Sequence, residues 1–209
     1  MPFCHRNSRR IRALAAAFGL LAVAMIAASG PASASEPGRF QLAVYGGKAA
    51  EDRLIEILTR YNTGFIDSRL VALAPSWIHG EGKNIRREIE GQIVRHWGLQ
   101  DHWEFNLAYV LRWMNFPWDH YVDTRFAVGG GVSWATEVPF IEPRAKELGL
   151  EESTRLLGYL MVEWEFAPPR DSQWSGFVRL HHRSGAKGIF DDVNGGSNFV
   201  TLGMRYRFD

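Results

Sequence analysis

The sequence has almost no cysteine: Cys4 is the only one among 209 residues. A single cysteine cannot form a disulfide within the chain, and Cys4 lies in a segment that we expect to be removed on export. Disulfide bridges therefore cannot hold the exported protein together, and its fold must rest on other contacts.

Long apolar runs are equally scarce, and the one that exists lies near the N-terminus, at residues 13–28. Four arginines precede it and Ala32-Ser33-Ala34 follows it, which is the layout of a secretory signal peptide cleaved after Ala34. At about 16 residues the run is shorter than the roughly 20 that a spanning helix needs, which disfavours the alternative of an uncleaved anchor. We therefore expect residues 1–34 to direct export and residues 35–209 to form one domain.

The chain also lacks an excess of positive charge once this segment is removed. The segment holds four of the 24 basic residues and none of the 23 acidic ones, so residues 35–209 carry 20 basic and 23 acidic residues. No cluster or stripe of Lys and Arg remains in them. A nucleic-acid partner is therefore not expected.

What the sequence does have is the alternation of polar and apolar residues that is typical of β-strands. From Trp103 to Trp113 the odd positions are aromatic or aliphatic, whereas the even positions include Glu104, Asn106 and Arg112. Charge on one face of strand after strand is hard to bury in a soluble β-sandwich, which is the main alternative. It is ordinary inside a small barrel whose other face contacts lipid. The pattern predicts an all-β fold, an eight-stranded antiparallel transmembrane β-barrel of the outer membrane.

Eight segments carry this alternation, and with the first strand running outward three of the four outer connections are long, as in outer-membrane barrels. Residues 52–60 instead have helix-like spacing, which is consistent with a short helix on the first outer loop, a periplasmic plug or a missed strand. The role of residues 48–68 is left open. The expected strands are 40–47, 69–79, 86–97, 102–113, 122–135, 155–166, 174–183 and 198–208.

The most informative residues are His182 and Ser184, at the end of the seventh expected strand. Residues i and i+2 of a strand project from one face, and a histidine beside a serine can deprotonate it. Their face also carries Val178 and Leu180, so it should meet lipid, with Asn198 of the last strand at the same height. Unpaired polar groups that face hydrocarbon are costly, which indicates a functional site.

The final 35 or so residues carry a more specific pattern: His182-Arg-Ser-Gly185, a polar glycine-rich loop over 191–198, and a closing strand over 199–208. In these motifs the chain resembles the outer-membrane lipid A 3-O-deacylase family, the PagL-like enzymes. The resemblance implies a serine esterase that hydrolyses an ester-linked acyl chain of lipid A, the lipid anchor of lipopolysaccharide, without metal or other cofactor.

The same resemblance implies a role for each site residue. Ser184 is the nucleophile and His182 its general base, whereas Asn198 stands where the family has a glutamate that orients the histidine; a charge from Asp191 or Asp192 is the alternative. Gly185 replaces a family asparagine, and backbone N–H groups of Gly185 and Gly188 are expected to bind the oxyanion.

Other polar residues near the site are assigned separately. Arg179 and Arg183 should point inward and pair with Glu163 and Glu165, which leaves Lys187 as the candidate for lipid phosphate. A metal site built from His181, His182, Asp191 and Asp192 is disfavoured, because His181 should point to the opposite face.

Two other functions compete with the esterase. The departures at Asn198 and Gly185 favour a non-catalytic structural or interaction barrel. A solute pore is disfavoured because side chains fill the interior of an eight-stranded barrel. The acyl position that is cut and the formation of a homodimer are left open by the sequence.

Overall fold

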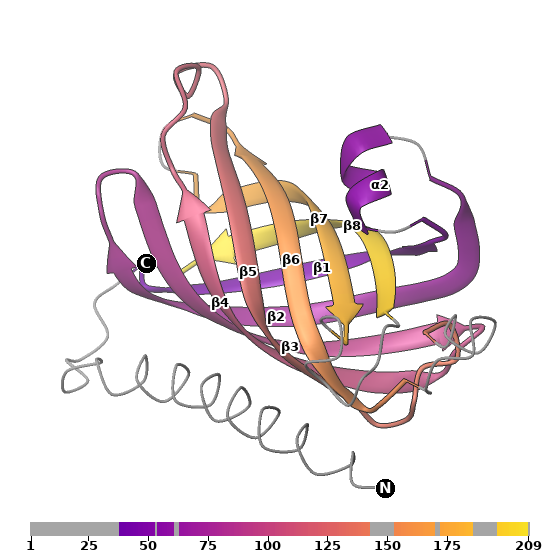
Figure 1. Ribbon diagram of the computed structural model, residues 1–209. Coiled ribbons are helices and arrows are strands. Elements are labelled where there is room, and N and C mark those ends of the chain that lie inside the picture. Colours follow the sequence, from indigo (N-terminus) through magenta and orange to yellow (C-terminus); the bar gives the residue numbers. More distant parts are fainter. Residues whose placement is uncertain are drawn as a thin grey trace, which may run out of the picture. The chain divides into compact units, whose positions relative to one another are not determined.

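The computed structural model describes residues 38–52, 54–60, 63–142, 153–169, 172–185 and 196–208. Eight antiparallel strands pair in sequence order, and β8 closes onto β1, so the expected barrel is confirmed and the β-sandwich is excluded (Figure 1). The proposed signal peptide lies outside the described residues. The elements are β1 Phe40–Ala50, α2 Leu54–Arg60, β2 Phe65–Glu81, β3 Ile85–Gly98, β4 His102–Trp113, β5 Asp123–Ala135, β6 Leu156–Ala167, β7 Trp174–Ser184 and β8 Gly196–Arg207.

The segment with helix-like spacing forms a helix, α2, directly after β1. It lies on the first connection at the same end of the barrel as Ser184, so the missed-strand alternative is wrong. Among the described residues, none of the helices has the length and apolar character needed to cross a membrane.

The connections differ between the two ends of the barrel. At the Ser184 end they are residues 51–64, 99–101, 136–155 and 185–195, and at the other end 82–84, 114–122 and 168–173. Long loops on one side and short turns on the other are typical of outer-membrane barrels, in which the long loops are extracellular. We therefore assign the Ser184 end to the extracellular side. The short 99–101 connection is the exception, and Gly98, with φ +106°, makes it possible.

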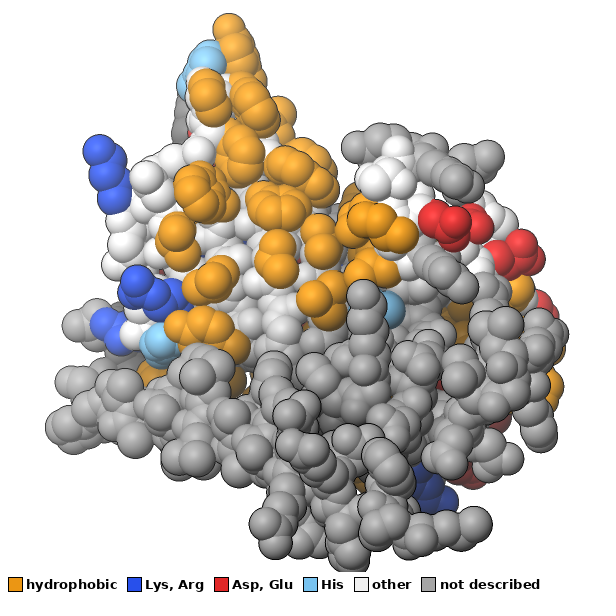
Figure 2. All heavy atoms as spheres, viewed as in Figure 1, with side chains coloured by type: hydrophobic (Ala, Val, Ile, Leu, Met, Phe, Trp, Pro, Cys, Tyr) orange, Lys and Arg blue, Asp and Glu red, His pale blue; other side chains and the backbone are white. Residues whose placement is uncertain are grey.

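The outer wall of the barrel is apolar. Figure 2 shows hydrophobic side chains gathered over one side of it, and their alternation with buried residues follows the strand period of two. In a bilayer such a wall faces hydrocarbon, and its tryptophans near the strand ends suit the interfacial regions. Exposed members include Phe105, Leu107, Leu111, Trp113, Val128, Val132, Trp134, Trp164, Phe166, Val178, Leu202 and Met204.

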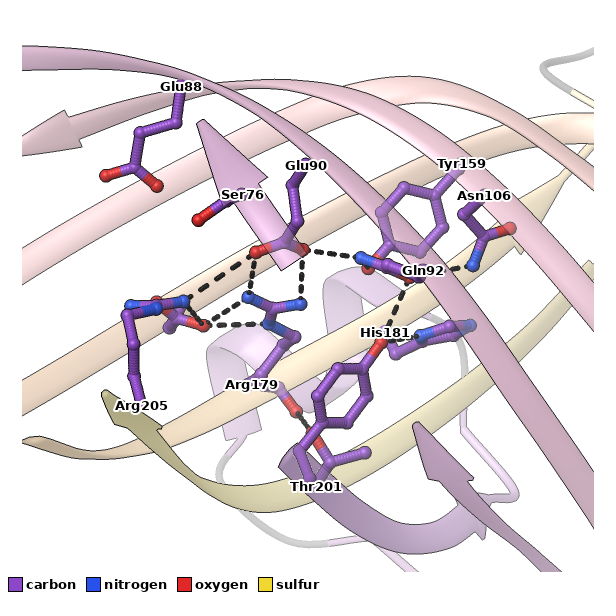
Figure 3. Close-up of polar contacts among 12 residues, drawn as sticks. Ser76, Glu88, Glu90, Gln92, Asn106, Tyr159, Arg179, His181, Thr201 and Arg205 are labelled. Atoms are coloured by element: carbon purple, nitrogen blue, oxygen red, sulfur yellow. Dashed lines mark hydrogen bonds and ion pairs between the residues drawn. The ribbon is translucent and has the colours of Figure 1, made fainter. Parts of the chain in front are cut away.

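The interior is ionic. Arg112 donates to Glu88 at 2.7 Å and to Glu163 at 2.6 Å. Arg179 donates to Glu163 at 2.7 Å and to Glu90 at 2.7 Å, and Figure 3 shows Arg179 facing Glu90 across the barrel. These side chains are at most 1% exposed. Buried charge is tolerated only when it is paired, and the guanidinium fork supplies several donors at once.

This ionic network lies across the barrel interior, since it joins carboxylates of β3 and β6 to arginines of β4 and β7. The expected pairing of Arg179 with Glu163 is confirmed. The expected pairing of Arg183 with Glu163 or Glu165 is wrong: its Nη1 lies 3.2 Å from Glu142 Oε1. Arg183 lies four residues beyond Arg179 on β7, where its register partner is Tyr159 and not Glu163.

Candidate functional site

The candidate site lies on the outer wall at the extracellular end of β7 and β8. In β7 the residues Ser175, Phe177, Arg179, His181 and Arg183 point inward and are buried, so the alternate residues, which include His182 and Ser184, point outward. Across the sheet, His182 pairs with Asn198 and Ser184 with Gly196. The register expected from the sequence is therefore the one the structure has.

A chain of hydrogen bonds fixes the histidine ring. His182 Nδ1 lies 2.7 Å from Asn198 Oδ1, and Asn198 Nδ2 donates to the backbone carbonyl of Asp52 at 3.0 Å. Because that carbonyl can only accept, it holds the amide nitrogen of Asn198 on its side and turns the amide oxygen toward the histidine. An oxygen acceptor at Nδ1 requires the Nδ1–H tautomer of His182. Its Nε2 then carries the lone pair that a general base needs.

Ser184 is flanked on both neighbouring strands by glycine. Gly158 of β6 and Gly196 of β8 are its register partners, and neither has a side chain beside the hydroxyl group. Gly196 is required by the close approach of the two strands, because a Cβ there would lie 2.3 Å from the carbonyl oxygen of Arg183. Neither neighbouring strand therefore places a side chain beside Ser184 on the outer wall.

The remaining predicted site residues are placed only in part. Gly185 directly follows β7. Lys187, Gly188, Asp191 and Asp192 lie outside the described residues.

The metal site that the sequence pattern disfavoured, with His181 and His182 as shared ligands, cannot form, because these adjacent histidines point to opposite sides of the barrel wall. His181 points into the barrel, where its Nε2 lies 2.9 Å from Glu104 Oε1 and its Nδ1 lies 3.1 Å from the hydroxyl of Tyr45. His182 faces out. The two rings therefore cannot share an ion.

Two features of the site were missed by the sequence reasoning. The Asp52 carbonyl comes from the segment between β1 and α2, far away in sequence from Asn198, and no local pattern indicates such a contact. The pair of glycines beside Ser184 could have been found, since Gly158 interrupts the run of large outward residues Leu156, Leu160 and Val162.

Comparison with known proteins supports the fold. No family model matches the sequence, and no curated protein matches it. The structure is similar to that of the outer membrane enzyme PagL, with a TM-score of 0.54 and 12% identity over 79% of this chain and 98% of PagL. It is also similar to Neisserial surface protein A, with a TM-score of 0.50 and 9% identity over 83% of this chain and 100% of that protein. At such identities the likeness shows an outer-membrane barrel fold and leaves the activity to be argued from the site.

Proposed function

We propose that this protein is a serine esterase that hydrolyses an ester-linked acyl chain of lipid A in the outer leaflet of the outer membrane. The observation that carries the proposal is the oriented histidine: an Asn198 amide, itself held by the Asp52 carbonyl, fixes the ring of His182 beside Ser184 on the lipid-facing wall. A lipid-facing wall without a catalytic function would not be stabilised by a hydrogen-bonded histidine and serine at this position, because polar groups that face hydrocarbon cost free energy.

In the proposed reaction, Ser184 Oγ attacks the acyl carbonyl while His182 Nε2 takes the hydroxyl proton. The oxyanion receives hydrogen bonds from backbone N–H groups at Gly185 and Gly188. The C–O bond to the leaving alcohol then breaks, the imidazolium gives its proton to the departing alkoxide oxygen, and an acyl-serine remains. Water, deprotonated by His182, releases the fatty acid and restores the enzyme.

The position of the site favours a lipid substrate. The outward residues below the dyad, such as Val178 and Leu202, are apolar and exposed, so an acyl chain lying against the wall would contact them. The ester of a lipid in the outer leaflet would then lie near the extracellular end of β7. The choice of lipid A within this class rests on the motif at His182 to Gly185 and on the closing strand, in which the chain resembles the deacylases.

A non-catalytic barrel is the second candidate, and the amide at Asn198 favours it. An amide fixes the tautomer but carries no charge to stabilise the imidazolium. The amide also has a reason that does not involve loss of catalytic function. Residue 198 accepts a hydrogen bond from His182 and donates one to the Asp52 carbonyl, and a carboxylate can only accept.

Mass spectrometry of lipid A from cells that express the wild type, Ser184→Ala or Ser172→Ala tests the proposal. Ser172 lies in the turn before β7, at the opposite end of the same strand, and serves as the matched control. We expect one acyl chain to be lost with the wild type and the control and retained with Ser184→Ala. Identical lipid A in all three strains, with every variant folded in the outer membrane by its heat-dependent gel mobility, would contradict an esterase acting on this lipid.

A further inference from the structure

A second polar cluster lies inside the barrel beneath the short β3–β4 connection. His96 of β3 and His102 of β4 are register partners, and their rings stack with centroids 4.4 Å apart and an interplanar angle of 12°. Glu104 is two residues beyond His102 and therefore points to the same inner face. All three side chains are buried, and one ligand atom from each lies within 4.8 Å of the other two.

The cluster contains buried polar atoms without a partner in the described part of the chain. One is His102 Nε2, whose residue is 4% exposed. Gln100 Oε1, which belongs to the same hairpin, is also buried without a partner. Buried polar atoms are almost always paired, so two neighbouring exceptions indicate that a further group belongs there.

We propose that His96, His102 and Glu104 bind a divalent transition-metal ion, with zinc as the best fit, inside the extracellular end of the barrel. Two imidazoles and a carboxylate are a common zinc ligand set, and the fourth position is left to water. With bonds of about 2.0–2.2 Å the ligand atoms of a tetrahedral site lie roughly 3.3 Å apart. Rotations of the three side chains about their own bonds supply the small closure required.

Neighbouring groups are placed to orient the ligands. His96 Nε2 lies 2.8 Å from Glu104 Oε2, and Gln100 Nε2 lies 3.1 Å from His96 Nδ1. When Nε2 binds the metal, the proton moves to Nδ1, and a rotation of the Gln100 amide presents its unpaired Oε1 to that N–H. Glu104 Oε1 keeps its contact with His181 Nε2, at 2.9 Å, while Oε2 turns to the ion. Such outer contacts are typical of metal sites.

The local charge is compatible with a cation. Two guanidinium groups lie near the cluster, and each is paired with a carboxylate. Arg183 Nη2 donates to the Arg155 carbonyl at 3.0 Å and its Nη1 lies 3.2 Å from Glu142. Arg95 donates to the backbone carbonyls of His96 and His102 and forms an ion pair with Asp101. The carboxylates of Glu104, Glu142 and Asp101 and the guanidinium groups of Arg183 and Arg95 together carry one negative charge when the imidazoles are neutral. A dication therefore meets net attraction at this cluster, and its burial strengthens that attraction.

The test measures cobalt and zinc binding to the full chain. The protein is refolded in detergent without a histidine tag and is stripped of metal with a chelator before the titration. We expect the visible d–d absorption of four-coordinate cobalt on adding Co²⁺, its loss on adding Zn²⁺, about one zinc per chain after gel filtration, and a higher unfolding temperature with zinc. His102→Ala should abolish all four signals. It removes an Nε2 that has no hydrogen-bond partner, so the barrel should still form.

The matched control is His79→Ala, which removes another barrel histidine, near the periplasmic end, whose Nε2 contacts the hydroxyl of Tyr109. It should bind metal as the wild type does. A second variant, Glu104→Gln, keeps the size of the side chain and should weaken binding at least tenfold. The proposal is overturned if the folded wild type shows no cobalt spectrum and no zinc, or if His102→Ala binds metal with unchanged affinity.

Discussion

The link between Asn198 and His182 can be broken without touching the proposed nucleophile. Asn198→Ala removes the oxygen that lies 2.7 Å from His182 Nδ1 and, with it, the group that selects the Nδ1–H tautomer. The net hydrogen-bond energy of about 0.5–1.5 kcal/mol corresponds to a two- to tenfold loss of rate. Loss of the fixed ring orientation lowers the rate further. When the histidine of a catalytic triad adopts the wrong tautomer, the rate falls by about 10⁴-fold. We therefore expect kcat/KM to fall by about 10- to 10³-fold.

Asn198→Asp is the informative partner of that variant. A carboxylate accepts from His182 with a charge-assisted bond, roughly twice as strong as the neutral one, which favours the reaction. Its second oxygen, however, faces the Asp52 carbonyl, where Asn198 Nδ2 now donates at 3.0 Å. Two acceptors at that distance repel, so the segment between β1 and α2 must move. We expect activity within about tenfold of the wild type and a lower unfolding temperature.

The assay is the release of fatty acid from purified lipid A in mixed micelles, with Ser184→Ala as the inactive reference. Folding is checked for each variant by heat-dependent gel mobility. The reasoning fails if Asn198→Ala retains wild-type kcat/KM while Ser184→Ala is inactive, because the amide would then have no part in orienting the base.

Three further predictions concern the rest of the structure. Glu163→Gln leaves buried arginines without their counter-charge and should lower the free energy of unfolding in urea by about 3 kcal/mol or more, whereas Asp67→Asn, in an exposed pair with Arg69, should cost less than about 1 kcal/mol. Gly196→Val brings side-chain atoms against the Arg183 carbonyl and should abolish fatty-acid release and lower the unfolding temperature; wild-type values for both would refute the close approach. Burial raises the pKa of Glu142 despite the nearby arginine, so the folded state binds this proton more tightly than the unfolded state and stability falls as the pH rises from about 4.3 toward neutrality. Glu142→Gln removes this contribution, so between about pH 4.3 and neutrality its unfolding free energy should fall less, or rise more, with pH than that of the wild type. Equal slopes would contradict the direction of the shift.

Much of the fold follows from the sequence because a barrel strand has a period of two. The expected strand at 102–113 coincides with β4, and the others differ from the observed strands mainly at their ends. The largest difference is β2, which begins at Phe65 rather than at residue 69, because its pairing with β1 continues past an irregularity near Lys48 into the loop. Strand extension of this kind depends on the partner, which local alternation does not report.

The same period explains which parts of the site the sequence could place. It puts His182 and Ser184 on one face and His181 on the other, as the structure has them. It does not say what each side chain contacts. The partners of His182 and His181 lie on β8, β1 and β4, and the contact from Asp52 comes from a loop, so these pairings depend on closure of the barrel.

The interior network and the outer site are coupled through strand register. A slip of one residue in the pairing of β6 with β7 would turn His182 and Ser184 inward and carry Arg179 out into lipid, away from Glu163 and Glu90. Each buried ion pair opposes that slip, because an unpaired charge inside the barrel or in hydrocarbon costs several kcal/mol. The ionic core therefore does more than fill the barrel: it fixes which face of β7 meets the membrane, and so the placement of the proposed dyad on the outer wall depends on arginines and glutamates that never contact substrate.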